Sequence, residues 1–221
     1  MTTTERAAVA GFAITVPQDW YELELDPQRR DAVILAQVAD RSDGSDLDPR
    51  RSALVDFLLD QAGQAWDSGA VYSASLVELT DDGPVTATVT VSVVLGPPTA
   101  DPDDPDRLSD LVEPLQEKVA GPGDDTWIRV TVVDLPGPGP AARAYGVEDL
   151  DLPDQAGRLR IVSMQTMVPI PGLNRVVLIT CTSPLVSLAE PLFELFDLIS
   201  ASFELTTVQL SEAEVGNGSA Q

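Results

Sequence analysis

Carboxylates are the most abundant side chains in this sequence that could do chemistry. The 221 residues include 36 Asp and Glu against 13 Lys and Arg and no histidine, so the formal net charge is −23. Two neighbouring carboxylates can act as general acid and base, and a cluster of them can hold Ca²⁺ or Mg²⁺. The densest groups are Asp101, Asp103, Asp104 and Asp106, and then Asp149, Asp151 and Asp154. Neither group has the glycine and terminal glutamate of a calcium-binding loop, so we interpret both as solvated acidic loops.

The single cysteine, Cys181, is the one candidate thiol nucleophile. It follows the apolar run VVLIT, and the sequence has no histidine to act as its base, so we predict that it packs in the core. One cysteine and no histidine also exclude a disulfide within the chain, a histidine-based triad and a cysteine-cluster zinc or iron–sulfur site. The Gly–Pro segments lack the lysine of a phosphate-binding loop. We therefore predict no catalytic residue, no metal and no cofactor, and interpret the chain as a non-enzyme.

Aromatic side chains are the next candidates, because those with a polar group often anchor protein interfaces. Trp20 and Tyr21 follow a proline turn, and Trp127 lies near the start of an expected strand, so we take these three as candidate partner contacts. Trp66 falls on the apolar stripe of an expected helix and is predicted to lie in the core.

The strong negative charge indicates which partners the chain can bind. Phosphate backbones and anionic lipid surfaces are repelled, so we predict no nucleic acid and no membrane partner. A basic protein partner is favoured by electrostatic steering, and a homo-oligomer is left open. Arg158 and Arg160 share one strand face and could bind an anion, but pairing with surplus acids is the favoured interpretation.

The apolar segments of the chain are short. The first ten residues, MTTTERAAVA, lack the basic start and the apolar run of a signal peptide. The longest apolar stretches, such as 91–95 and 176–179, are far shorter than the roughly 18 residues that indicate a membrane span. We therefore predict a cytoplasmic protein.

About six main strands are expected from alternating and β-branched residues. They cover 70–79, 84–95, 126–135, 141–147, 158–168 and 175–182, after a short strand at 11–16. Within 84–95, apolar residues alternate with threonines, which is the pattern of an antiparallel strand with one buried face. The Asp–Gly pair before this run predicts a hairpin with the preceding strand.

Two helices are expected in the first third of the chain. Asp26 and Asp48, each followed by proline, are good N-caps. The apolar residues after Asp48 recur as the broad stripe of a helix that lies on a sheet, and Gly69 is expected to end this helix.

Two further helices are expected later in the chain. An apolar stripe runs from Leu108 towards Gly121, and Pro114 within it is expected to kink or shorten the helix. The last helix is predicted to begin near Ser187, whose spacing to Glu190 matches a capping box.

These elements together predict one α+β domain with a largely antiparallel sheet of about six strands packed by helices. The domain spans 11–205, preceded by a flexible N-terminus over 1–10 and followed by a disordered acidic tail over 206–221. We expect the helices to seal the sheet and to leave no reactive cleft.

The beginning and the end of this domain carry a resemblance to a known family. The segment FAITVPQDWYEL, residues 12–23, is similar to the strand, proline, turn and tryptophan that open the Mog/PsbP-like α/β/α sandwiches. Towards the C-terminus, strands at 165–168 and 176–181 precede a helix that ends FDLISASF, as in the same family. The chain departs from the family in the additional acidic segment 26–66 and in the missing export signal.

The resemblance implies an actinobacterial α/β/α sandwich from a group of mainly binding modules. That group includes domains of unknown function, lipoproteins and chaperones for secreted effectors, and it carries over no catalytic residue. Together with the charge, it predicts a non-enzymatic cytoplasmic protein-binding adaptor or chaperone-like module, linked to a secretion system. A carboxylate- or metal-dependent hydrolase and a binder of small apolar ligands are the alternatives.

Overall fold

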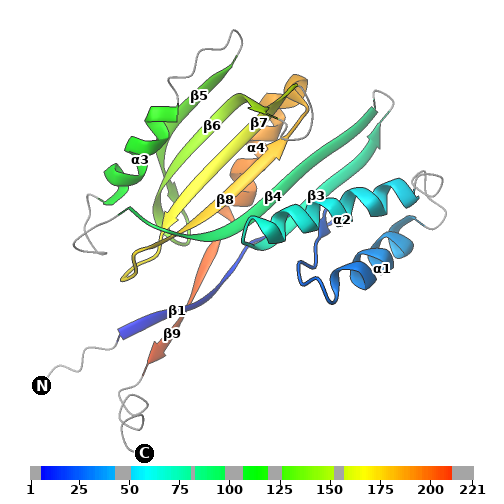
Figure 1. The fold of residues 1–221 in the computed structure, drawn as a ribbon. Helices are drawn as coiled ribbons and strands as arrows, with labels where there is room; N and C mark the ends of the chain where they lie inside the picture. The colour runs from blue at the N-terminus through cyan, green and yellow to red at the C-terminus, as the bar shows by residue number, and fades with distance from the viewer. Residues whose placement is uncertain are drawn as a thin grey trace, which may run out of the picture.

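The structure is a computed structural model that describes residues 6–42, 51–80, 83–97, 107–118, 126–151 and 157–210. Its elements follow one another along the chain as shown in Figure 1. The strands are β1 (Arg6–Ala13), β2 (Tyr21–Glu22), β3 (Ala70–Thr80), β4 (Gly83–Leu95), β5 (Trp127–Leu135), β6 (Gly139–Asp151), β7 (Arg158–Pro169), β8 (Arg175–Ser183) and β9 (Glu204–Leu210). The helices are α1 (Arg30–Ser42), α2 (Arg51–Asp67), α3 (Arg107–Lys118) and α4 (Ala189–Ala201), with a 3₁₀ turn, η2 (Val186–Leu188), directly before α4.

A seven-stranded antiparallel sheet forms the centre of the molecule. Its strand order is β2-β3-β4-β8-β7-β6-β5, and every neighbouring pair is antiparallel. The six main strands expected from residue 70 onward are confirmed, and the short β2 joins one end of the sheet through the pairing of Tyr21 with Ser75. The chain is therefore an α+β protein with a large antiparallel sheet, as the sequence predicts.

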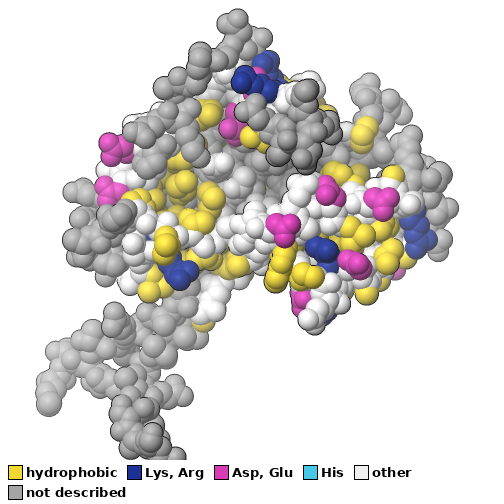
Figure 2. Space-filling model, in the orientation of Figure 1, with side chains coloured by type: hydrophobic (Ala, Val, Ile, Leu, Met, Phe, Trp, Pro, Cys, Tyr) yellow, Lys and Arg dark blue, Asp and Glu magenta, His cyan; other side chains and the backbone are white. Residues whose placement is uncertain are grey.

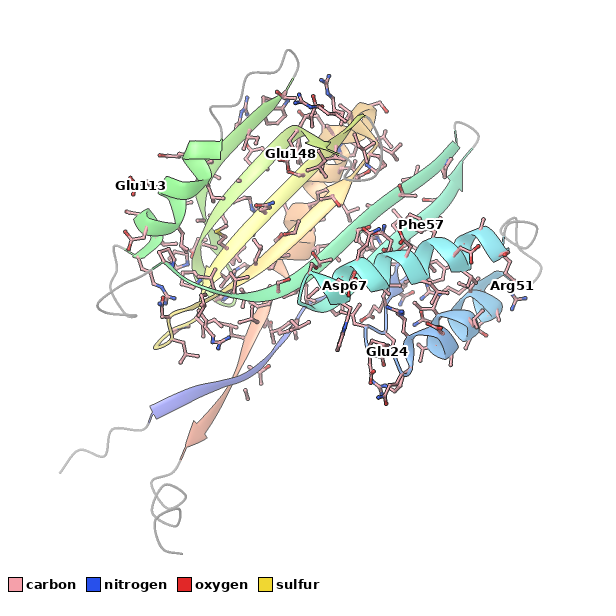
Figure 3. All side chains as sticks on the ribbon, in the orientation of Figure 1. Glu24, Arg51, Phe57, Asp67, Glu113 and Glu148 are labelled. Carbon is pink, nitrogen blue, oxygen red and sulfur yellow. The ribbon has the colours of Figure 1, made fainter. Side chains whose placement is uncertain are left out.

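Alternation along the strands sends apolar side chains to both faces of this sheet. On one face, Phe196 of α4 shares the main core with Val89 of β4 and Ile179 of β8. On the other face, α2 lies over β3, and α3 lies over β5 and β6 (Figure 1). Figure 3 shows Phe57 on α2 and Glu113 on α3, at opposite sides of this second face. Helices thus cover the sheet from both sides.

Most helices follow the sequence expectations, and the entry into the last helix differs. α2 ends just before Gly69, whose φ of 77° is a left-handed conformation that glycine adopts readily; its expected N-cap, Asp48, lies outside the described residues. α3 continues through Pro114 to Lys118, so this proline does not end the helix. The capping box predicted at Ser187 is wrong, because the chain enters α4 through η2, and the N-cap is Leu188, which makes no side-chain hydrogen bond. Among the described residues, no helix is both long and apolar enough to cross a membrane.

The two ends of the described chain pair with each other in a separate two-stranded sheet. β1 and β9 are antiparallel, with Phe12 opposite Leu205, and Figure 1 shows this ribbon extending away from the seven-stranded sheet. Residues 6–10 and 206–210, predicted as parts of a flexible N-terminus and a disordered tail, therefore belong to strands. Composition does not reveal this pairing, because it joins segments from opposite ends of the sequence and has no local turn signal. The residues beyond both strands lie outside the described part of the chain.

Candidate binding groove

A groove of about 380 Å³ lies between α4 and the sheet face formed by β5, β6 and β7. Its lining side chains come from these four elements: Trp127, Arg129, Thr131, Val133, Arg143, Tyr145, Met164, Glu190, Phe193, Glu194 and Asp197. The helices therefore do not cover this face of the sheet completely, contrary to the expectation that they seal it. α4 packs mainly on β7 and β8, so the outer strands β5 and β6 extend beyond the helix and leave a groove along its side.

The spacing of residues on β5 and α4 explains the composition of this groove. Successive strand residues face opposite sides of a sheet, so Trp127 and the alternate residues after it face α4, whereas Ile128 and Val130 pack beneath α3. Three exposed carboxylates recur at helical spacing on the groove side of α4: Glu190, Glu194 and Asp197. The groove therefore has an aromatic and β-branched wall and a carboxylate rim.

Three aromatic side chains form the apolar part of the groove. Trp127 lies edge-to-face with Tyr145 and with Phe193, at ring-centroid distances of 6.0 Å and 5.7 Å, and Tyr145 and Phe193 are 5.3 Å apart. The guanidinium of Arg129 lies 5.3 Å from the centre of the Trp127 ring, as in a cation–π pair. Trp127 is 38% exposed, so part of its ring is available to a ligand. Clustered, partly exposed aromatic side chains are typical of binding surfaces.

Arg143 is a buried cation at the floor of the groove, only 4% exposed. Its Nε donates a hydrogen bond to Oγ1 of Thr166 at 3.0 Å, and its Nη1 donates to the carboxylate of Asp197 on α4. Nη2 has no hydrogen-bond partner among the described residues. This ion pair links α4 to β6, and the positive charge of Arg143 offsets the negative charge of Asp197. Among the rim carboxylates, Glu190 and Glu194 are left without an ion pair to any described residue.

Replacing Asp197 with asparagine is expected to lower the free energy of unfolding by about 2 kcal/mol, because the buried Arg143 charge loses its carboxylate partner. The loss stays below that of a fully buried pair because the Asp197 side chain is largely exposed, and solvent screens it. Denaturant unfolding measures the change. Adding Arg143→Met is expected to recover part of the loss, since it removes the buried charge. A double variant that is less stable than Asp197→Asn would contradict this explanation.

The three aromatic contacts predicted from the sequence have different positions in the structure. Trp20 and Tyr21 are each 2% exposed, so both are core residues and not surface contacts. Trp20 lies in the main core, and Tyr21 lies in the core beneath α1 and α2, where the guanidinium of Arg41 is 4.5 Å from its ring centre. Trp127 is the member of the three that reaches the surface, and it does so at the groove. Trp66, predicted as core, is 49% exposed near the end of α2.

The partners of Trp127 in the groove were not identified in the sequence. Tyr145, Arg143 and Phe193 belong to β6 and α4, and strand order together with helix packing brings them to Trp127. A local signal was present on α4, where carboxylates recur at the helical spacing opposite the apolar stripe. It indicates an exposed acidic helix face, but it does not say which strands lie beside that face.

Cys181 lies in the core, as predicted from its apolar neighbours. It is fully buried on β8, and burial raises the pKa of its thiol to about 12, against a smaller opposite effect of Arg143. We therefore expect the native protein to resist iodoacetamide at about pH 8 and to react once it is unfolded. Mass spectrometry after labelling with and without denaturant checks this. Rapid labelling of the native protein would contradict the burial of the thiol.

The acidic groups singled out in the sequence are only partly described by the structure. Asp101 to Asp106 and Asp154 lie outside the described residues. Asp149 pairs with Arg160 at 2.7 Å, and the hydrogen bond from Arg160 lowers the pKa of the Asp149 carboxyl below its usual value. The salt pairing predicted for Arg160 is thereby confirmed. Within the described ranges, no three His, Cys, Asp or Glu side chains are grouped so that they could hold a metal ion.

The opposite face of the sheet has a polar strip between α2 and α3. Its side chains pair across β4, β8 and β7 in two rows: Thr88, Thr182 and Ser163, and then Thr90, Thr180 and Gln165. Figure 2 shows mostly white atoms in this region, between hydrophobic side chains on either side. The strip offers hydrogen-bonding groups, whereas the groove combines aromatic rings with carboxylates in a concave surface. The groove is therefore the stronger candidate site.

Comparison with known proteins identifies no family for this chain. It finds a solved structure whose sequence has low identity to this one. No family model and no curated protein matches the chain. Among solved structures, the chain is similar to the crystal structure of LpqN, described as involved in cell envelope biogenesis of Mycobacterium tuberculosis. The two sequences are 13% identical, the TM-score is 0.46, and the match covers 92% of each chain.

Proposed function

We propose that this chain is a protein-binding module and that the groove between α4 and β5 binds a basic segment of its partner. The observation that carries the proposal is the cluster of Trp127, Tyr145 and Phe193 beside Glu190 and Glu194, in a chain of net charge −23. Aromatic rings bind both apolar surface and cations, and carboxylates attract cations. Lysine and arginine side chains fit both features, because they combine an apolar stem with a charged end.

The proposal includes the wider role predicted from the sequence. The chain acts as a cytoplasmic adaptor or chaperone-like protein without catalysis, and its fold is a Mog/PsbP-like α/β/α sandwich. The fold assignment is supported by one antiparallel sheet with helices on both faces. The binding role is supported by a groove whose rim carboxylates, Glu190 and Glu194, are exposed.

A small apolar ligand is the second candidate for the same groove. The aromatic cluster favours it, together with Val133 and Met164 in the lining. The volume of about 380 Å³ falls within the roughly 300–1,000 Å³ of small-molecule sites. Salt separates the two candidates, because rising ionic strength weakens the binding of a cationic segment but not of a neutral ligand. A rise in Tm with a neutral apolar ligand, unchanged by salt, would favour this second candidate.

A peptide of alternating lysine and valine, about ten residues long, tests the leading proposal. We expect it to bind at least about tenfold more tightly than a glutamate–valine peptide of the same length, because the rim and the net charge repel the latter. Fluorescence anisotropy of labelled peptides measures both affinities. Equal affinity for the two peptides, or binding of neither, would refute the proposal.

Two charge-matched double variants separate the groove from the overall charge of the chain. Glu190→Gln with Glu194→Gln removes two rim carboxylates and is expected to weaken binding of the lysine–valine peptide about tenfold. Asp67→Asn with Glu113→Gln removes two charges from α2 and α3, on the other face of the sheet (Figure 3), and is expected to change the affinity less than about twofold. Equal losses in both double variants would show that net charge alone attracts the peptide.

A further inference from the structure

β5 is the end strand of the seven-stranded sheet, and no described residue pairs with its outer edge. It runs for nine residues, Trp127–Leu135, whereas β2 at the other end of the sheet has two. Edge strands are usually kept short, or carry proline or lysine, because their free N–H and C=O groups can pair with another chain. β5 has neither proline nor lysine, and its two charged residues are Arg129, which stacks on Trp127, and Asp134 near its end. Its outer edge is therefore able to accept a further strand.

The side chains of β5 also suit an added strand. Val130 to Val133 are all β-branched, and such residues favour extended pairing. α3 covers the beginning of β5 at Ile128 and Val130, but Val132 on the same face is 52% exposed. An added strand would cover part of this exposed valine, so burial of apolar surface would accompany the backbone hydrogen bonds.

The groove runs along this same strand. Alternate residues of β5, from Trp127 to Val133, line it, with α4 on its other side. Neighbouring strands lie about 4.8 Å apart, so a strand added to β5 would follow the open side of the groove. Every second side chain of that strand would point to the α4 face, where Glu190 and Glu194 form the rim. A lysine or arginine stem is long enough to extend back over β5 towards these carboxylates.

We infer that the basic segment of the partner binds as an added strand on the outer edge of β5, with alternate lysine or arginine side chains over the groove. The inference rests on the proposed function and specifies how the segment is held: backbone hydrogen bonds supply affinity, and the groove selects the side chains. A second copy of this chain is a poor occupant, because two chains that each carry a net charge of −23 repel each other.

N-methylation of the lysine–valine peptide tests this mode of binding. Successive N–H groups along a strand point to opposite edges, and methylation prevents the donation of a hydrogen bond. One peptide carries methyl groups on the backbone nitrogens of its lysines, and the other carries them on the backbone nitrogens of its valines. For a given direction of the added strand, only one of these two sets points at β5 while the lysine side chains face the groove. We expect one methylated peptide to lose at least about tenfold in affinity and the other to stay within about twofold of the unmethylated peptide.

The outcomes distinguish this inference from the proposed function. If the unmethylated peptide binds and both methylated forms bind equally well, strand addition is overturned, while the groove still binds basic side chains. If the unmethylated peptide does not bind, the proposed function itself fails. Sedimentation provides a further control: a dimer that dissociates when the peptide binds would assign the β5 edge to a second copy of the chain and overturn the inference.

Discussion

Replacing Trp20 with alanine is expected to lower the free energy of unfolding by about 3–5 kcal/mol. The side chain is 2% exposed and belongs to the main core, so its removal leaves a cavity in close-packed surroundings. The backbone at this position is held as well, because Nη1 of Arg41 donates a hydrogen bond to the Trp20 carbonyl at 2.8 Å. The chain is therefore poorly able to collapse into the cavity. Denaturant unfolding of the two proteins measures the difference.

Trp66→Ala is the matched control, since it deletes the same side chain from an exposed position. Trp66 is 49% exposed near the end of α2, and its loss is expected to change the free energy of unfolding by less than about 1 kcal/mol. The sequence predicts the reverse order, because Trp66 falls on an apolar stripe and Trp20 follows a turn. A larger loss for Trp66→Ala than for Trp20→Ala would contradict the burial of the two side chains described above.

Gly146→Ala is expected to displace β5 from β6 and to lower the free energy of unfolding by about 3 kcal/mol. A Cβ at this position would overlap the carbonyl oxygen of Trp127 and would lie 2.8 Å from the Cα of Ile128. Both are backbone atoms, so no side-chain rotation relieves the overlap, and β5 must move. Because Trp127 moves with β5, the lysine–valine peptide is expected to lose affinity as well. Denaturant unfolding and peptide anisotropy measure the two effects.

Gly157→Ala is the control for this glycine, because a Cβ there meets no atom of a described residue within 4 Å. We expect it to keep both the stability and the peptide affinity of the parent protein, with at most a small gain from the reduced freedom of the unfolded chain. If Gly146→Ala also kept both properties, the close approach of β5 to β6 at this glycine would be refuted.

The strands and their buried faces follow from local residue patterns. On β4, the apolar residues Ala87, Val89 and Val91 are buried, and the threonines between them lie on the other face, as the alternation predicts. Cys181 is buried on β8 for the same reason, since its neighbours are apolar. Such patterns are reliable because side chains alternate with a fixed period along any strand, whatever the strand pairs with.

The candidate groove was predicted much less well. Trp127 was the one groove residue among the predicted contacts, and the two others, Trp20 and Tyr21, lie in the core. Burial of a tryptophan depends on whether other elements cover it. Trp66 has the right helical spacing for burial, but it lies near the end of α2, where its side chain remains half exposed. No local spacing contains that information.

Composition and short-range periodicity settled the charge of this protein, its lack of histidine chemistry, and its antiparallel α+β class. The tertiary structure determined the other features. Strand order places β5 at the edge of the sheet and pairs β1 with β9. The packing of α4 on β7 and β8 leaves a groove beside Trp127. The reason is that periodicity reflects forces between residues a few positions apart. The position of a strand in a sheet depends instead on how all the buried faces pack at once.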